Sequence, residues 1–529
     1  MDYHFTCHLQ AVLGLLAFVF LHIILWRSRK TSKKLAPEVP GAWPIIGHLC
    51  QLSGTSENVP FARTLGALAD KYGPIFTLRM GMYPYLIISN WEAAKDCLTT
   101  HDKDFAARPT SMAGQSIGYK YARFTYSNFG PYYSQVRKLA LTQVLSSTKL
   151  EKMRHIRVSE VENSIKDLYS LTQVAPKNEV NISEWFYQLT LNIIVKTICG
   201  KRYSKIEEDE EAQRCRKAFK GIMYVVGQIV LYDAVPFPLF KYFDFQGHIK
   251  LMNNIYKDLD SILQGWLDDH MKKKDVKFED QDAIDAMLRA TDVNEFKAYG
   301  YSQATVIKST VLSLILDGSD TTTVHLIWIM SLLLNNPHAM KQAQEEIDAK
   351  VGKDRWVEES DIKNLVYLQA IVKETLRLYP PVPLLLPHEA VQDCKVVGYD
   401  IPKGTRLYIN AWKIQRDPDI WPEPEKFMPE RFLTSKANID ARSQHFEFIP
   451  FGSGRRSCPG ITFANLVTHL TFARLLQGFD FSKLSNAPID MTEGVGITLP
   501  KVNQVEVLVT PRLSSKIYLF SKCKLSDMG

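Results

Sequence analysis

The segment from Phe451 to Gly460, which reads FGSGRRSCPG, constrains the fold more than any other part of the chain. Its three glycines and one proline exclude a regular helix or strand, because glycine is conformationally free and proline has no amide hydrogen. Arg455 and Arg456 precede Cys458 and favour its thiolate form. The apolar run 461–476 predicts a helix whose N-terminal dipole also favours an anion. The segment therefore predicts a loop that either presents a thiolate or buries a structural cysteine.

Composition excludes several classes of protein. With 529 residues the chain exceeds the usual size of one hydrophobic core, so length alone suggests more than one domain. A net charge of +7 suits an anionic membrane or an acidic partner, but it is too diffuse for nucleic-acid binding, and no zinc spacing is present. The eight cysteines are scattered without a C-x-x-C pair, which is typical of a reducing compartment.

An apolar run of 18 residues lies near the N-terminus, from Leu9 to Trp26. It is long enough to span a bilayer, and five basic residues follow it within 27–34 while only Asp2 carries charge before it. This asymmetry predicts a single-pass anchor that leaves the rest of the chain in the cytosol. A cleaved signal peptide is the alternative, but it would need basic residues before the run and a small-residue cleavage site after it.

The remaining patterns divide the chain into an anchor with a basic flank (1–34), a proline-rich hinge (35–48), a main domain (49–512) and a surface tail (513–529). The main domain is predicted to be mainly helical with a minor β-sheet. A helix is expected over 61–70, helices dominate 140–390, and strand-like runs occur at 75–80, 85–89, 390–400, 406–410 and 505–510.

A polar insert, Asp317-Gly-Ser-Asp-Thr-Thr-Thr323, interrupts the apolar helix predicted over 312–334. Burying such an insert is costly unless its groups are hydrogen-bonded, and Gly318 permits a local distortion of the helix. A capped helix N-terminus is the alternative, and the apolar residues on both sides argue against it.

Further along, Glu374 and Arg377 share a helical face, and the segment 429–432 reads Pro-Glu-Arg-Phe.

These motifs, in this order, together with FAARP at 105–109 and YSQVR at 133–137, resemble the cytochrome P450 monooxygenases. The spacing of Phe451, Gly454, Arg456, Cys458 and Gly460 is similar to the haem-binding signature of that family. The resemblance implies the cytochrome P450 fold and one haem b (iron protoporphyrin IX). Cys458 would be the axial ligand of the iron, and thiolate donation favours O–O cleavage. Arg137 and Arg456 would pair with the haem propionates, and Phe451 would border the haem.

The resemblance also implies roles for the other motifs. Asp320 and Thr321 would deliver protons during oxygen activation. Glu374, Arg377 and Arg431 would interlock and hold the cysteine loop. Two residues depart from the family pattern: Tyr133 stands where the family usually has Trp, and Asp317 where it usually has Ala or Gly.

Within the family, the chain is similar to plant microsomal members, in particular the group that contains nicotine N-demethylases and tropinone synthase. This implies a monooxygenase in the endoplasmic reticulum membrane, facing the cytosol. It would take electrons from an NADPH-haemoprotein reductase and use O₂ to oxidise a C–H bond beside nitrogen in a small alkaloid. The alternatives are a hydroxylase of benzylisoquinoline alkaloids, terpenoids or furanocoumarins, a reductase-independent isomerase or dehydratase, or a haem sensor. The pair Asp320–Thr321 argues against the last two.

Asp317 is the candidate substrate contact. Helical spacing places it on one face with Asp320 and Thr321. A buried carboxylate needs a partner or becomes protonated, and a substrate ammonium would serve. The alternative is that Asp317 pairs with a Lys, an Arg or a backbone amide. The resemblance places the substrate pocket between five segments, 111–124, 219–226, 314–317, 382–386 and 495–498.

Overall fold

The computed structural model describes Gly14 and residues 34–53, 59–174, 178–203, 209–272, 282–442 and 444–519. The predicted membrane anchor lies outside these residues, Gly14 apart. Among the helices that the structure does describe, none is both long and apolar enough to cross a bilayer.

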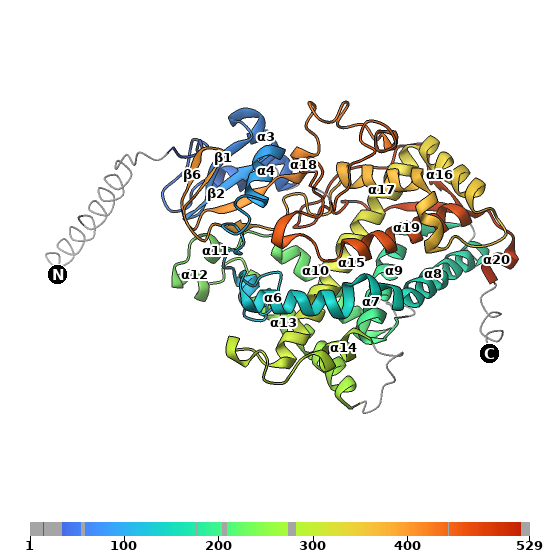
Figure 1. Cartoon of the computed structure of the whole chain (residues 1–529), viewed down its shortest axis with the longest axis horizontal. Helices are drawn as coiled ribbons and strands as arrows, with labels where there is room; N and C mark the ends of the chain where they lie inside the picture. Colours follow the sequence, from blue (N-terminus) through green and yellow to red (C-terminus); the bar gives the residue numbers. More distant parts are fainter. Residues whose placement is uncertain are drawn as a thin grey trace, which may run out of the picture.

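The described chain is mainly helical, as the sequence predicts, and the helices occupy most of the molecule beside a smaller region of strands (Figure 1). The longest helix, α15 (Gln303–Asn335), has 33 residues. The long helices besides α15 are α3 (Phe61–Tyr72), α6 (Pro131–Ala140), α8 (Arg154–Val174), α9 (Ile182–Cys199), α10 (Glu210–Val226), α13 (His248–Lys272), α16 (Pro337–Lys350), α17 (Val366–Leu378) and α19 (Ile461–Gly478). The shorter ones are α2 (Leu49–Ser53), α4 (Trp91–Leu98), α5 (Met112–Gln115), α7 (Ser147–Lys152), α11 (Leu231–Ala234), α12 (Pro238–Tyr242), α14 (Ala283–Ala290), α18 (Ala411–Ile414) and α20 (Ser515–Leu519).

The strands form three small sheets. The four-stranded sheet has the order β1-β2-β7-β4, in which only the β2–β7 pair is parallel; a three-stranded antiparallel sheet has the order β3-β9-β8, and β5 and β6 form a hairpin. The strands are β1 (Ile75–Met80), β2 (Tyr83–Ile88), β3 (Glu179–Asn181), β4 (His388–Glu389), β5 (Cys394–Val396), β6 (Tyr399–Ile401), β7 (Arg406–Ile409), β8 (Phe479–Lys483) and β9 (Glu506–Pro511). The predicted strand at 75–80 is confirmed, whereas the run 390–400 is a hairpin rather than one strand.

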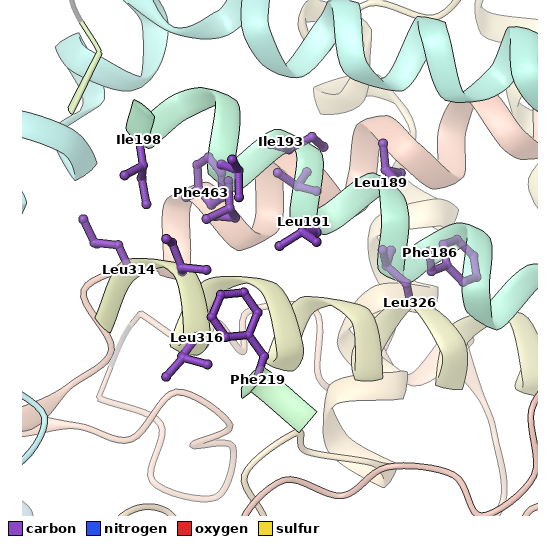
Figure 2. Packing of buried hydrophobic residues seen from close by; sticks show 14 of the residues in the cluster. Phe186, Leu189, Leu191, Ile193, Ile198, Phe219, Leu314, Leu316, Leu326 and Phe463 are labelled. Carbon is purple, nitrogen blue, oxygen red and sulfur yellow. The ribbon is translucent and has the colours of Figure 1, made fainter. Parts of the chain in front are cut away.

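The largest apolar core surrounds α15, with α9 and α19 packed close to it (Figure 2). Gly318 has a packing role here, because a Cβ at this position would lie 3.0 Å from Cδ1 of Ile194 on α9. The helix is continuous through this glycine, so the predicted distortion is not observed. The nearby Thr190 and Thr323 hydroxyls, 2.6 Å apart, join the same two helices in the buried interior.

Two segments at the ends of the described chain pack against the main domain. In the proline-rich segment 35–48, Ala36 and Val39 are buried, and the Val39 amide donates to Thr77 O of β1 at 2.9 Å. The C-terminal tail is not wholly at the surface. Helix α20 lies within it, and the buried Tyr518 stacks on Tyr169 with ring centroids 4.2 Å apart. Apolar side chains in both segments find neighbours that are remote in sequence.

Candidate active site

The loop that precedes α19 folds tightly around Cys458. The Cys458 amide donates to Phe451 O at 2.9 Å, and the amides of Gly460 and Ile461 donate toward the thiol sulfur. Gly454 adopts a positive φ of 69°, and a Cβ there would lie 2.4 Å from Oδ1 of Asp102, so no other residue fits. Burial raises the pKa of the Cys458 thiol, while the two amides and Arg137 act in the opposite direction.

Two arginines concentrate positive charge at this loop: Arg108, which is buried, and Arg456, which belongs to the loop and is partly buried. Arg456 donates to Ala106 O and Ser127 O, and Arg108 donates to Leu386 O and Pro387 O, whereas Nε of Arg108 is buried without a partner. Burial lowers the pKa of Arg108 to about 9, with Arg456 as the second cause, and it lowers the pKa of Arg456 to about 10. Burial and the charge of Arg108 also hold the pKa of His388 well below its usual value. This concentration of positive charge suits an anionic ligand.

Arg137 and Tyr133 on α6 hold the loop from the other side. Arg137 donates to Ser457 O at 2.6 Å, and the Tyr133 hydroxyl donates to Arg455 O at 3.0 Å. Tyr133 therefore supplies a hydrogen bond where the family usually has Trp. Sequence reasoning missed Arg108 and His388 as site residues. The FAARP motif contained the signal for Arg108, whereas His388, a lone histidine at the start of β4, carried none.

A cavity of about 1110 Å³ opens above Cys458 and Phe451 and extends to α15. Its lining includes residues from all five segments predicted to form the pocket. Cys458 is the one described cysteine among the lining residues; Cys394, by contrast, lies in the β5–β6 hairpin. We call the 451–460 loop with Arg108, Arg137 and Arg456 the cavity floor.

On the other side lies the segment of α15 that carries Asp317, Asp320 and Thr321, which we call the distal wall; of these three, Asp317 and Thr321 line the cavity. The Thr321 hydroxyl donates to Asp317 O at 2.6 Å, and Thr498 donates to Oδ2 of Asp320 at 2.9 Å. Burial raises the pKa of Asp320 to about 6, against the opposing effect of the Thr498 hydrogen bond. Thr321 lines the cavity with Asp317, whereas Asp320 points toward Thr498.

Asp317 has protein partners in the structure. Oδ1 accepts from Arg123 at 2.5 Å and Oδ2 accepts from the Thr125 hydroxyl at 2.9 Å, which matches the alternative of an arginine pair. Nevertheless 43% of the Asp317 side chain stays accessible, and this surface borders the cavity. Burial raises the pKa of the carboxyl group, and Arg123 is the main opposing influence.

Glu374, Arg377 and Arg431 meet in the buried interior. Arg377 binds both carboxylate oxygens of Glu374 at 2.8 Å, and Arg431 Nε donates to Oε1 at 3.1 Å. Gln415 connects this cluster to the floor, because its amide group donates to Arg377 O and accepts from the Ile449 amide. The chain thus brings together three predicted residues that are up to 57 positions apart.

The residues of the floor fit a haem group. The cavity is large enough, its arginines would face two propionates, and the orphaned Nε of Arg108 would gain a partner. A thiol that receives two amide hydrogen bonds suits a thiolate ligand to iron. Fold and site together define a haem-thiolate enzyme.

Comparison with known proteins agrees with this assignment to the haem-thiolate enzymes. The family model for cytochrome P450 matches residues 37–507, so the chain belongs to the cytochrome P450 family, whose members bind haem through a cysteine thiolate. A zebrafish cytochrome P450 solved with progesterone has a TM-score of 0.71 and 26% identity, covering 86% of this chain and all of that one.

Closer relatives in sequence are plant cytochromes P450. The chain is 51% identical to nicotine N-demethylase CYP82E3 of Nicotiana tomentosiformis over 96% of this chain and 99% of that protein. It is 46% identical to vinorine hydroxylase of Rauvolfia serpentina (96% and 98%) and 45% identical to xanthotoxin 5-hydroxylase CYP82C2 of Arabidopsis thaliana (95% and 98%). These relatives are named for the oxidation of alkaloids or of a furanocoumarin, and all of them are monooxygenases.

Proposed function

We propose that the protein is a membrane-bound monooxygenase of plant specialised metabolism that oxidises a C–H bond next to nitrogen in a small alkaloid. It takes electrons from an NADPH-haemoprotein reductase and uses O₂. The observation that carries the proposal is a single cavity with Cys458 at its floor and Thr321 and Asp317 at its distal wall.

In this proposal the Cys458 thiolate would hold the iron of haem b, and Arg108, Arg137 and Arg456 would bind the propionates, with Phe451 beside the haem. The haem, when bound, supplies the oxygen activation. The protein residues supply positions and protons: Thr321 offers a hydroxyl in the cavity, and Asp320, whose pKa is near 6, exchanges protons close to neutral pH. Glu374, Arg377 and Arg431 keep the loop in place through Gln415.

The alkaloid assignment rests on Asp317 and on the relatives. The accessible carboxylate can accept a hydrogen bond from a protonated amine, which would turn a C–H bond next to nitrogen toward the iron. Oxidation there leads to N-demethylation. In a pyrrolidine that carries a β-keto acid arm it leads instead, by loss of water, to an iminium ion, which the carbon between the two carbonyl groups of the arm attacks; ring closure with loss of CO₂ then gives tropinone. The 51% identity to a nicotine N-demethylase supports the first outcome.

The test is metabolite profiling of the membrane-bound protein with reductase, NADPH and a panel of pyrrolidine alkaloids, benzylisoquinolines, terpenoids and furanocoumarins. We expect NADPH- and O₂-dependent product from a pyrrolidine alkaloid. The variants Asp317→Ala and Asp317→Asn should raise the Kd of a cationic substrate about tenfold, the value of a charged hydrogen bond. Unchanged Kd values would remove Asp317 from substrate binding.

A hydroxylase of a benzylisoquinoline alkaloid, terpenoid or furanocoumarin is the second candidate. The relatives named vinorine hydroxylase and xanthotoxin 5-hydroxylase favour it. Product from those panel members alone would establish it. Turnover of an oxygenated substrate without reductase would instead indicate an isomerase or dehydratase.

The endoplasmic reticulum location and the single-pass anchor follow from the apolar run 9–26 and the basic residues after it. Deleting residues 1–34 should move much of the protein from the membrane fraction to the soluble fraction while the haem spectrum is retained. Loss of all folded haem protein on deletion would mean that the segment belongs to the folded core.

A further inference from the structure

An ion pair with one buried partner, Arg123, and one accessible partner, Asp317, connects the loop between α5 and α6 to the distal wall. Arg123 donates to Oδ1 of Asp317 at 2.5 Å and to the Ser313 hydroxyl at 3.0 Å, while Thr125 occupies Oδ2 of Asp317. All four side chains line the cavity. The pair is the charged group at the point where α15 borders the cavity, and other charged residues, including Asp233, line the cavity elsewhere.

The loop reaches this arrangement through an unusual backbone. Tyr119, Lys120 and Tyr121 have φ values of 52°, 53° and 69°, a left-handed conformation that residues with a side chain rarely adopt. Two glycines make the turn possible, since a Cβ on Gly114 would lie 2.4 Å from Cε1 of Tyr121 and one on Gly118 would lie 2.4 Å from Gly114 O. The turn directs Arg123 toward α15.

The two partners differ in exposure. Only 3% of the Arg123 side chain is accessible, compared with 43% of Asp317. A ligand in the cavity therefore meets the carboxylate first, and the guanidinium lies behind it. A carboxylate oxygen that already accepts one hydrogen bond can accept another, so Asp317 can bind a ligand donor without losing Arg123.

We propose that Arg123 sets the charge selectivity of the substrate cavity. Because its positive charge offsets that of Asp317, the wall binds a substrate through an N–H or O–H donor and gives little advantage to a permanent cation that lacks such a donor. The substrate class is then a protonated secondary or tertiary amine rather than a quaternary ammonium ion. This inference rests on the proposed function, because it assumes that the ligand contacts Asp317.

The experiment measures Kd by absorbance titration of the full-length haem protein and, independently of the haem spectrum, by equilibrium dialysis. Three probes share a phenyl-substituted five-membered ring: 1-methyl-2-phenylpyrrolidine, its 1,1-dimethyl quaternary salt, and the neutral hydrocarbon isostere of that salt, 1,1-dimethyl-2-phenylcyclopentane. The Arg123→Gln variant should lower the Kd of the quaternary ion about tenfold relative to the hydrocarbon, because the carboxylate is no longer offset. A change in this ratio of less than about twofold overturns the proposal.

The double variant Arg123→Gln/Asp317→Asn supplies the matching test. It removes both charges, so the Kd of the quaternary ion relative to the Kd of the hydrocarbon should return to about the value in the unmodified protein. If Arg123 had only a structural role, this Kd ratio in the double variant would stay at its value in Arg123→Gln. The control for lost stability is Arg157→Gln, which breaks a similar buried pair with Glu359 (Nη2–Oε2 2.9 Å) that does not line the cavity. Arg157→Gln should leave the Kd of the amine and the Kd of the quaternary ion unchanged relative to the Kd of the hydrocarbon.

If Arg123→Gln gives no folded haem protein, the Asp317→Asn variant alone tests the proposal. This variant leaves the positive charge of Arg123 beside the cavity without the carboxylate that offsets it. The Kd of 2-phenylcyclopentane carboxylate should then fall about tenfold relative to the hydrocarbon, and an unchanged Kd overturns the proposal. Product formation with reductase and NADPH is measured in parallel. Turnover of an alkaloid combined with unchanged charge ratios would refute the role of Arg123 and leave the proposed function intact.

Discussion

The cavity floor and the distal wall hold their charged side chains in different ways. On the floor, Arg456, Arg108 and Arg137 donate to main-chain carbonyls, which stay in place when neighbouring side chains change. On the wall, Asp317 and Asp320 depend on other side chains, Arg123, Thr125 and Thr498. A single substitution can therefore remodel the wall, while the floor changes only if its loop unfolds. This difference suits a fixed cofactor beside a variable substrate.

The largest expected effect is on the floor. Cys458→Ser should abolish the long-wavelength ferrous-CO band that thiolate ligation gives. The control Cys215→Ser changes a buried cysteine outside the cavity and should retain the band. A normal CO spectrum in Cys458→Ser would exclude this residue as the ligand.

The next effect tests whether the floor depends on its buried support. Glu374→Ala leaves Arg377 and Arg431 buried without their anion, and removing one partner of a buried pair costs about 3–5 kcal/mol. We expect a large loss of folded haem protein, measured as CO-binding yield and thermal midpoint. Asp361→Ala, which breaks the exposed pair with Arg355, should cost about 1 kcal/mol or less. Equal losses in the two variants would contradict the assigned role.

The wall should respond in catalysis without loss of the fold. Thr321→Ala removes the hydroxyl from the cavity, so NADPH oxidation should continue while product falls and hydrogen peroxide rises. Ser331→Ala serves as the control, because its buried hydroxyl donates to Ile327 O away from the cavity. The measurement is the ratio of product to NADPH consumed, and the same ratio in Thr321→Ala and the unmodified protein would remove Thr321 from the mechanism.

The smallest effect is a pH dependence of stability. The pKa of Asp320 is raised from 3.8 to about 6 in the folded protein, so between these values the folded state binds more protons than the unfolded state. Its contribution to stability therefore falls as pH rises from about 4 to about 6. Asp320→Asn should raise the thermal midpoint by a few degrees more at pH 7 than at pH 4, since the Thr498 hydrogen bond can remain. An equal shift at both pH values would contradict the raised pKa.

Sequence reasoning located much of the fold and site. It predicted β1 at its observed bounds and found the helix after Cys458, because apolar periodicity is a local property. It missed Arg108 and His388, which lie together because the Glu389 amide of β4 donates to Ala107 O in the 105–109 segment. It also assigned the role of Gly318 to helix distortion, whereas the structure shows a close contact with Ile194, which lies on another helix.

The sequence by itself determined the class of cofactor, because the order and spacing of its motifs around Cys458 resemble the haem-binding signature of the family. The loop alone left open whether Cys458 presents a thiolate or is a structural cysteine. The sequence also determined that Asp317 would share a helical face with Thr321, because helical spacing is local. Only the tertiary structure decided the partner of Asp317. Arg123 lies 194 positions away and reaches α15 through a left-handed turn, and side-chain pairing over that separation depends on the packing of the whole domain rather than on any local pattern.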